Sequence, residues 1–249
     1  EYRLEAGMTP RTFLALLSSG RVITYRFTLV EGWSFRQLAD ALVNEAGLVH
    51  ELDLNDPGQW AVSKLIPEIS PPEGWFLPET YQFTRGDSDR DILLRSYDAM
   101  LTALNEAWES RDLSLPLDSP YQLLILASII EKETALDEER GQIAGVFVRR
   151  LNQGMRLQTD PTVIYGMGEA YDGDIRRKDL RTDTPYNTYT RHGLPPTPIA
   201  MPGRASLQAA ARPEPGETLY FVADGKGGHT FSRTLAEHQA AVKKLIGNH

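Results

Sequence analysis

Two periods of apolar residues follow one another in the first third of the chain. Between residues 23 and 29 every second residue is apolar, which predicts a half-buried β-strand. From residue 35 to residue 42 the apolar positions have the spacing of one helix face. Ser34, with Gln37 three positions later, has the pattern of a capping box, so we expect a helix that begins directly after Ser34.

A short sequence echo links this helix to an earlier one. Residues 4–9 read L-E-A-G-M-T and residues 29–34 read L-V-E-G-W-S, and each segment follows a strand-like stretch and precedes a helix-like one. We expect the earlier helix to lie between Thr9, a favourable N-cap, and Gly20, a residue that often ends helices. The two units indicate a small α+β module over residues 1–72, although ordinary helix-start chemistry explains the echo equally well.

Prolines and a glycine after this module indicate a domain boundary. Pro71 and Gly74 lie where the helical and strand patterns stop, and an aromatic-rich extended segment follows, up to residue 83. We therefore expect a second domain over residues 73–249. Its first helix is predicted to begin after Ser88, another favourable N-cap.

The most apolar stretch of the chain lies in this second domain. Residues 121–130 follow a Ser-Pro helix start and are apolar nearly all round, which predicts a buried helix. A further helix is expected directly after it, with Thr134 or Asp137 as its N-cap and Gly154 at its end.

A long irregular segment separates these helices from the C-terminal part. Residues 155–203 are rich in proline, glycine, threonine and tyrosine, and a loop of this length in a compact domain is usually functional or disordered. Its many aromatic residues argue against disorder. A hairpin over residues 219–231 and a closing helix follow. The expected fold class is α+β, with a mixed α/β second domain and a long loop-rich cleft.

Composition narrows the class of function. The 249 residues carry a formal net charge of −8 and the basic residues form only scattered pairs, so nucleic-acid binding is not expected. The absence of cysteine excludes disulfides and thiolate chemistry. The longest apolar run, residues 123–130, is far shorter than the roughly 18 residues of a membrane-spanning helix, and no signal peptide opens the chain.

The residue pattern gives no support to metal or cofactor chemistry. The five histidines have no metal-ligand spacing, and the sequence has no Walker loop, dinucleotide-binding glycine motif or nucleophile elbow. We therefore expect neither a metal ion nor a cofactor. The histidines are His50, His192, His229, His238 and His249.

A carboxyl group at the end of the buried helix is the leading candidate for catalysis. Glu131 directly follows the apolar run, where loss of water and the negative end of the helix dipole both favour a protonated carboxyl. A carboxylic acid that keeps its proton near neutral pH can serve as a general acid. The bland alternatives are that Glu131 is the first solvated residue after a core helix and that Glu133 is a surface charge.

Polar and aromatic residues of the long segment have the composition of a sugar-binding surface. Amides and carboxylates bind sugar hydroxyl groups, and aromatic faces stack on pyranose rings. A structural role, in turns or in covering the core, accounts for each residue equally well. The candidate substrate-binding residues, with Glu133 included, are Glu133, Gln158, Asp160, Tyr165, Tyr186, Asn187 and Tyr189.

Several longer segments carry a family resemblance. They are L-P-E-T-Y from Leu77, A-S-I-I-E-K-E-T from Ala127, R-L-Q-T-D-P-T-V-I-Y-G from Arg156, Y-N-T-Y from Tyr186, G-L-P-P-T-P-I from Gly193 and Y-F-V-A-D-G-K-G-G-H-T-F from Tyr220. Together they resemble the YceG-like family of endolytic murein transglycosylases, over roughly residues 1–245. A minor departure is Pro78-Glu79, where the family has Pro-Asp.

The resemblance implies a LysM-like N-terminal module and a catalytic domain in which Glu131 matches the family's catalytic glutamate. It also implies a single membrane-spanning helix upstream of this sequence, which would place the chain on the outer, periplasmic face of the cytoplasmic membrane. The implied substrate is the glycan strand of nascent peptidoglycan, and the implied partners are the peptidoglycan synthases.

The implied reaction needs only one carboxyl group. A lytic transglycosylase cleaves the β-1,4 bond after N-acetylmuramic acid by attack of the sugar's own 6-hydroxyl on C1, which leaves a 1,6-anhydro end. Glu131 would protonate the departing oxygen and then accept the 6-hydroxyl proton. Two alternatives stay open: a muramidase with Glu133 or Asp160 as its second carboxylate, and a non-catalytic glycan-binding scaffold.

Overall fold

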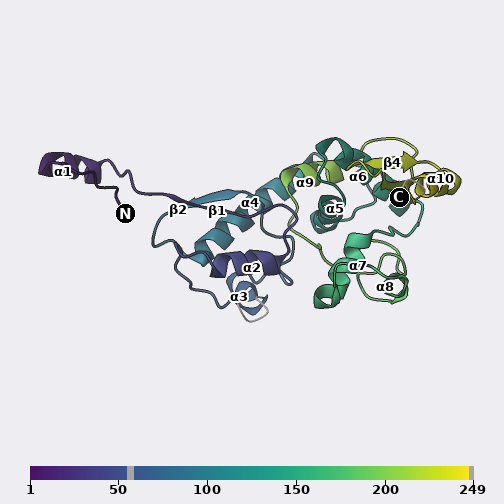
Figure 1. Cartoon of the computed structure of the whole chain (residues 1–249), viewed down its shortest axis with the longest axis horizontal. Helices are drawn as coiled ribbons and strands as arrows, with labels where there is room; N and C mark the ends of the chain where they lie inside the picture. The colour runs from purple at the N-terminus through teal and green to yellow at the C-terminus, as the bar shows by residue number, and fades with distance from the viewer. Residues whose placement is uncertain (55–58, 247–249) are drawn as a thin grey trace.

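The chain is elongated, with its first helix at one end and its last helix at the other (Figure 1). The computed structural model describes residues 1–54 and 59–246. The helices are α1 (Pro10–Ser18), α2 (Phe35–Val43), α3 (Gln59–Leu65), α4 (Asp89–Glu109), α5 (Pro120–Glu133), α6 (Asp137–Asn152), α7 (Asp160–Met167), the 3-10 helix η1 (Gly168–Ala170), α8 (Arg177–Arg181), α9 (Arg204–Ala211) and α10 (Leu235–Ile246). The strands are β1 (Tyr25–Thr28), β2 (Thr80–Phe83), β3 (Tyr220–Ala223) and β4 (His229–Ser232).

Strand β1 and helix α2 form where the alternation and the helical spacing predict them. Ser34 Oγ accepts a hydrogen bond from the N–H of Gln37, and the Gln37 side chain accepts one from the N–H of Ser34, so the capping box is formed. β1 pairs with β2 in an antiparallel sheet, in which Phe27 lies opposite Tyr81. The partner strand of the predicted module therefore comes from the aromatic-rich segment after the predicted boundary.

Two hydrophobic cores form among the described residues, and the first packs around β1, β2 and α2. This core also contains Ile92 and Leu93 of α4, and Met201 from a segment far along the chain. The N-terminal core therefore extends well past residue 72, where the sequence analysis ends the first module.

Helix α1 lies apart from both cores. The Thr9 side chain accepts a hydrogen bond from the N–H of Thr12, so Thr9 is the N-cap that the sequence predicts, but none of the residues of α1 is buried. Figure 1 shows α1, in purple, at the far end of the molecule beyond the β1–β2 sheet. The first unit of the sequence echo therefore does not join the packed module formed by the second.

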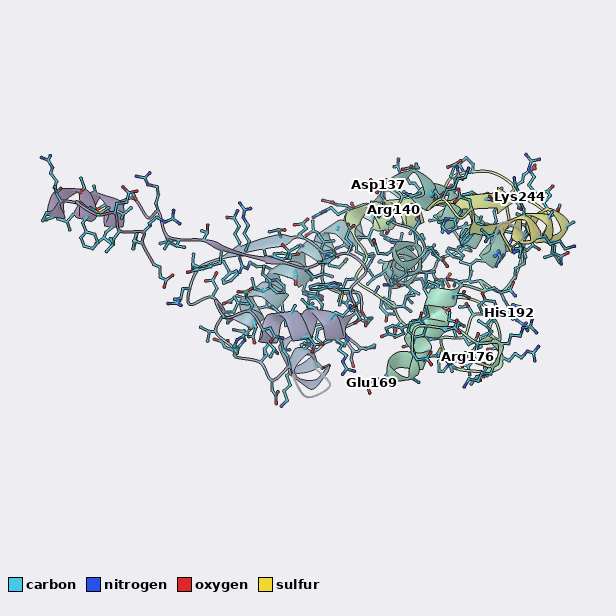
Figure 2. All side chains as sticks on the ribbon, viewed as in Figure 1. Asp137, Arg140, Glu169, Arg176, His192 and Lys244 are labelled. Atoms are coloured by element: carbon cyan, nitrogen blue, oxygen red, sulfur yellow. The ribbon has the colours of Figure 1, made fainter. Side chains whose placement is uncertain are left out.

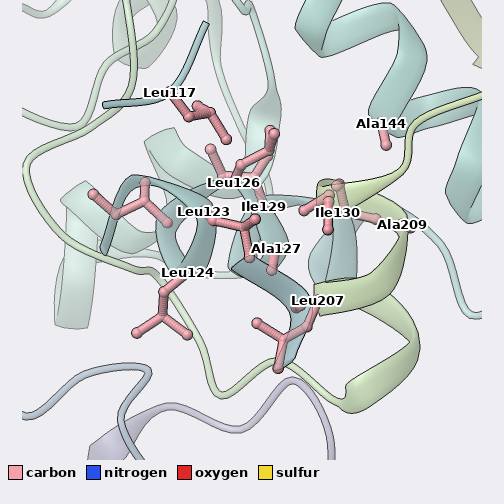
Figure 3. Packing of buried hydrophobic residues seen from close by; sticks show 14 of the residues in the cluster. Leu117, Leu123, Leu124, Leu126, Ala127, Ile129, Ile130, Ala144, Leu207 and Ala209 are labelled. Atoms are coloured by element: carbon pink, nitrogen blue, oxygen red, sulfur yellow. The ribbon is translucent and has the colours of Figure 1, made fainter. Parts of the chain in front are cut away.

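The second core forms around α5, which is buried on every side from Leu123 to Ile130. The helix begins after its N-cap Ser119, as predicted. Figure 3 shows side chains of α5 close to Ala144 of α6 and to Leu207 and Ala209 of α9. These contacts surround the whole helix and hold it in a single position.

The N-cap predicted for the next helix is wrong. The N-cap of α6 is Leu136, which makes no side-chain capping hydrogen bond, so neither Thr134 nor Asp137 has that role. Thr134 is instead the C-cap of α5, and its hydroxyl accepts a hydrogen bond of 3.0 Å from the N–H of Leu136. Thr134 therefore ends α5, and its hydroxyl stabilises the turn between α5 and α6.

The segment 155–203 is less irregular than predicted. It contains α7, which begins at Asp160 with a proline at its first turn, then η1 and the short helix α8. These helices have 8, 3 and 5 residues, too few for an apolar period to appear in the sequence.

The C-terminal hairpin and helix agree with the sequence analysis. β3 and β4 pair in antiparallel register with Phe221 opposite Phe231. In the turn, Asp224 accepts hydrogen bonds from the N–H groups of Lys226 and Gly228. The described part of the chain therefore has the predicted α+β fold, with two small two-stranded sheets.

Helix α4, with 21 residues, is long enough to span a bilayer but carries charged residues along its whole length. Among the described helices, none has both the length and the apolar character that crossing a membrane requires.

Replacing Ser88 by alanine should destabilise the chain through α4. Ser88 Oγ accepts the N–H of Asp91, and the Asp91 carboxylate accepts both the N–H and the hydroxyl of Ser88. Because Ser88 is buried, we expect Ser88→Ala to lower the free energy of unfolding by about 1–2 kcal/mol in denaturant titrations. Ser18→Ala, at an exposed position of α1, is the control, with a change below about 0.5 kcal/mol. Equal effects of the two substitutions would contradict this account of the cap.

Candidate active site

Glu131 lies in the last turn of α5, directly after the buried part of the helix. Its side chain is only 6% exposed. Oε2 accepts a hydrogen bond of 2.9 Å from the N–H of Gly203, and Oε1 lies 3.8 Å from Nη2 of Arg140, whose side chain is 7% exposed. The predicted catalytic carboxyl is therefore enclosed, with two groups beside it that stabilise its ionised form.

Two helices deliver these groups to Glu131. Gly203 is the N-cap of α9, and the N–H groups at the start of a helix favour a neighbouring anion. The start of α9 is held against α5 in part by the N–H of Ile199, which donates a 3.0 Å hydrogen bond to the Ser128 hydroxyl. Arg140 comes from the first half of α6. The packing that forms the second core therefore also sets the surroundings of Glu131.

The loop between β1 and α2 covers Glu131 from the N-terminal side. The N–H of Gly32 donates to the Met201 carbonyl at 2.9 Å, and the N–H of Met201 donates to the Trp33 carbonyl at 2.7 Å. Lys132 Nζ donates to the Gly32 carbonyl at 3.1 Å. A Cβ on Gly32 would lie 3.9 Å from Cγ of Glu131. The N-terminal part therefore reaches the candidate catalytic residue through main-chain contacts.

Glu31, in the same loop, brings a second carboxylate close to Glu131. A Cβ on Gly203 would lie 1.8 Å from Oε1 of Glu31, so this carboxylate lies against the residue whose N–H binds Glu131. Partial burial of the carboxylate raises the pKa of Glu31, the negative charge of Glu131 raises it further, and Arg140 lowers it. The two carboxyl groups therefore interact electrostatically.

Glu133, Asp160 and Tyr189, all predicted to bind substrate, meet in a second polar cluster. The Thr159 hydroxyl donates to Glu133, and the Tyr189 hydroxyl donates to Oδ1 of Asp160 at 2.5 Å. Burial raises the pKa of Glu133 to about 7. The hydrogen bond from Thr159 lowers this pKa, and the negative charge of Asp160 raises it. Glu133 is therefore not a plain surface charge.

Tyr165 and Tyr186 pack edge to face, with ring centroids 4.9 Å apart. The Tyr165 hydroxyl donates to Oε2 of Glu73 at 3.2 Å, and the hydroxyls of Tyr186 and Thr197 share a hydrogen bond of 2.9 Å. Glu73 is 5% exposed and also accepts the N–H of Phe35, the first residue of α2, at 2.9 Å. This group joins α7 to the N-terminal part, and burial raises the pKa of Glu73 to about 7.

The two predicted amide residues have different surroundings. Gln158 is exposed and has a left-handed backbone, with φ of 51°. Asn187 is buried, and its Nδ2 donates to backbone carbonyls of residues 179, 180 and 182. The Asn187 amide nitrogen is therefore bound within the loop that it shapes, and the predicted contact of Asn187 with a sugar stays a prediction.

A surface ion pair also connects the two parts of the molecule. Arg36 of α2 pairs with Glu169 of η1. Figure 2 shows Glu169 at the end of the α7–η1 segment that lies nearest to α2. Both side chains are largely exposed, so this pair contributes little to stability.

Two cavities of the described chain lie away from Glu131, and His229 has a structural partner. One cavity, of about 690 Å³, lies between α1 and residues 21–24, and another, of about 410 Å³, lies between α4 and α9; Glu131 lines neither. His229 Nδ1 lies 2.7 Å from Oε2 of Glu139. Within residues 1–54 and 59–246, no group of three or more histidine or acidic side chains is placed to hold a metal ion. His249 lies outside the described residues.

Sequence reasoning did not identify Arg140, Gly203, Glu31 or Glu73. Glu31, Glu73 and Gly203 reach their partners from distant parts of the chain, and Arg140 lies on the helix after Glu131, across a turn that the sequence did not define. Two weak signals existed. Glu31 is part of the E-G-W-S segment of the sequence echo, and Gly203 follows a proline directly before a helix.

The fold has a counterpart among solved structures. A 2.6 Å crystal structure of a YceG-like protein from Listeria monocytogenes matches this chain with a TM-score of 0.73 and 34% sequence identity, over 92% of this chain and 80% of that one. The two proteins therefore share both fold and sequence, and the class of protein is YceG-like.

The sequence model of the YceG-like family matches residues 1–244, and the chain belongs to this family, as its sequence motifs predict. It is 33% identical to a protein named endolytic murein transglycosylase from Bacillus subtilis (strain 168), over 99% of this chain and 72% of that protein. A protein of the same name from Streptococcus pneumoniae serotype 2 (strain D39 / NCTC 7466) is also 33% identical, over 67% of this chain and 32% of that protein.

Replacing Glu73 by glutamine should make the stability of the chain less dependent on pH. The pKa of Glu73 is about 7 in the folded chain, above the 4.5 of an unperturbed glutamate. The protonated form of Glu73 therefore stabilises the wild-type fold below pH 4.5, and this stabilisation is lost as the pH rises from 4.5 through about 7. Relative to the wild type, the free energy of unfolding of Glu73→Gln should therefore rise by about 3 kcal/mol between acidic and mildly alkaline pH.

Denaturant unfolding across this pH range measures the difference. Glu68→Gln, at an exposed position nearby in the sequence, is the matched control. A parallel rise in that variant would show that the pH dependence does not come from Glu73.

Proposed function

We propose that this chain is a lytic transglycosylase that cuts the glycan strands of peptidoglycan, with Glu131 as its general acid and base. The enclosed Glu131 carboxyl at the end of α5 carries the proposal, because a single shielded carboxyl is what this reaction requires. The relatives named endolytic murein transglycosylase, at 33% identity, support the enzyme class predicted from the sequence.

In the proposed reaction, protonated Glu131 gives its proton to the glycosidic oxygen as the bond from C1 of N-acetylmuramic acid to that oxygen breaks. The 6-hydroxyl oxygen of the same sugar forms a bond to C1, and its proton passes to Glu131. One product strand carries a 1,6-anhydro end, the other a free 4-hydroxyl, and no water is consumed. Between the two proton transfers, the Gly203 N–H and Arg140 stabilise the Glu131 carboxylate.

The proposed sugar contacts differ in exposure. Gln158 and Asp160 are exposed, so they are our candidates for direct hydrogen bonds to the glycan. Tyr165, Tyr186 and Tyr189 are half-buried and bonded to neighbouring polar groups, which suits them to form rigid walls for sugar rings.

We further propose that the chain works on the outer face of the cytoplasmic membrane, tethered by a helix upstream of this sequence and beside the peptidoglycan synthases. The family motifs support this placement, and a tether would raise the local concentration of the enzyme at the wall. Fractionation of cells that produce the natural gene product, combined with crosslinking to the synthases, tests it. Recovery in the cytosol would contradict the location, and an absence of crosslinks would contradict the partnership.

Replacing Glu131 by glutamine should abolish cleavage while the fold is retained. Glutamine keeps the shape of the side chain and an acceptor for the Gly203 N–H, but it has no acidic proton to give. We expect the rate to fall by at least about 10²–10⁴-fold. Mass spectrometry of purified glycan strands, after incubation with each protein, should find internal fragments with 1,6-anhydro ends for the wild type alone.

Glu138→Gln, an exposed glutamate of α6, is the matched control and should cleave as the wild type does. Equal cleavage by Glu131→Gln would remove Glu131 from the mechanism. Reducing ends that contain added water would indicate a muramidase, and the absence of cleavage by all three proteins would favour a glycan-binding scaffold.

A further inference from the structure

The mechanism above leaves Glu133 without a role. It is the last residue of α5, two positions after Glu131, and its carboxyl accepts a hydrogen bond from the Thr159 hydroxyl. Thr159 stands between Gln158 and Asp160, the two exposed residues proposed above to contact the glycan. We propose that Glu133 is a positioning residue, which holds Thr159 and thereby fixes the two flanking residues for glycan binding. The inference rests on the proposed function of that segment.

Residues 157–160 alternate between buried and exposed positions. Leu157 is 1% exposed and belongs to the second core, and Thr159 is 2% exposed, whereas Gln158 and Asp160 are exposed. The buried residues of such a segment anchor it, and the exposed ones are available to a ligand. Leu157 is anchored by apolar packing and Thr159 by its hydroxyl, so Glu133 supplies a polar anchor for the segment.

The Thr159 hydroxyl binds Glu133 in place of the contact that its position favours. Thr159 is the N-cap of α7, but its side chain makes no capping hydrogen bond. A threonine at this position ordinarily accepts an N–H of the first turn, which stabilises the helix. Here the start of α7 gives up that local contact, and the hydroxyl joins it to α5, which lies beside it (Figure 1).

The backbone of Gln158 is left-handed, with φ of 51°, which is unfavourable for a residue that has a side chain. Its neighbours hold it there. The N–H of Gln158 donates to the Thr188 carbonyl at 3.2 Å, and the N–H of Thr159 donates to the Thr188 hydroxyl at 3.1 Å. Strained residues persist only where the surroundings fix them, and they cluster at functional sites. Loss of the Thr159 anchor should therefore release Gln158.

The anchor and the proposed acid belong to one rigid element. Glu131 and Glu133 share the last turn of α5, whose buried part is packed on every side. On the outer side of the segment, the Tyr189 hydroxyl donates to Oδ1 of Asp160 at 2.5 Å. The sugar-binding segment is therefore ordered before the glycan arrives and is tied to the helix of the acid, so binding does not have to order it.

Replacing Thr159 by valine removes the hydroxyl and keeps the shape of the side chain. We expect KM for purified glycan strands to rise about tenfold, equivalent to about 1.4 kcal/mol of binding free energy. The change in kcat should stay below about twofold, because the acid itself is untouched. Thr159→Ser keeps the hydroxyl and should restore most of the wild-type KM.

A stability control separates position from general destabilisation. Ser88→Ala, which is expected to destabilise the chain through α4, should leave KM unchanged. An equal rise in KM for Ser88→Ala and Thr159→Val would overturn the positioning role, because loss of stability alone would then explain the weaker binding.

Two substitutions of Glu133 distinguish positioning from catalysis. Glu133→Gln keeps an oxygen that accepts the Thr159 hydroxyl, so its KM and kcat should stay within about fivefold of the wild type. Glu133→Met has a similar length and no such acceptor, and it should raise KM as Thr159→Val does. A larger fall in kcat for Glu133→Gln would overturn the positioning role, since it would identify a second catalytic carboxylate.

A positioning residue acts through the residues that it positions. In the double variant Gln158→Ala/Asp160→Ala both proposed sugar contacts are gone, so adding Thr159→Val should raise KM by no more than about twofold further. A full tenfold effect in this background would show that Thr159 acts on binding by another route, and would overturn the inference.

Binding can also be measured without cleavage. In the Glu131→Gln background, Thr159→Val should weaken the affinity for purified glycan strands about tenfold in isothermal titration calorimetry. Unchanged affinity would contradict the role of Glu133 and Thr159. If the wild type makes no 1,6-anhydro ends, the proposed function fails on that result, and this comparison of affinities alone decides whether the segment is positioned for glycan binding.

Discussion

Helix α5 has no exposed face between Leu123 and Ile130, so packing holds it on every side. A helix held in this way leaves little freedom to the residues of its last turn. Glu131 is therefore placed by the core rather than by its own contacts. The helices that complete the core, α6 and α9, bring Arg140 and the Gly203 N–H to the same carboxyl. One packing arrangement thus sets both the stability of the second core and the geometry of the candidate active site.

The N-terminal part of the chain contributes to this site directly. Met201 belongs to the first hydrophobic core, yet its main chain lies between Gly32 and the start of α9. Glu73 makes a second connection, between the first turn of α2 and Tyr165 of α7. Because both connections use buried or main-chain groups, the two parts meet in a defined geometry. The surroundings of Glu131 are therefore a property of the whole chain and not of its second core alone.

Local chemistry made much of the fold predictable. The caps at Ser34, Ser88 and Ser119 were predicted correctly, because these signals depend only on neighbouring residues, whereas the seven-residue helix α3 was not predicted. Thr134 was misread because a threonine can end one helix as well as begin the next. Glu131 stood out because it interrupts an apolar run. Its partners Arg140, Gly203 and Glu31 did not, since each is brought there by tertiary packing that leaves no mark in the local sequence.

The close approach of Glu31 to Gly203 also restricts how such a chain can evolve. A side chain at position 203 is accommodated only if residue 31 is shortened or turned away, because the two would occupy the same space. The two positions are 172 residues apart in the sequence: residue 31 lies in the loop between β1 and α2, and residue 203 is the N-cap of α9. They are therefore expected to vary together among homologues. A chimaera that takes its N-terminal core from one homologue and its second core from another has to inherit this pair from a single parent.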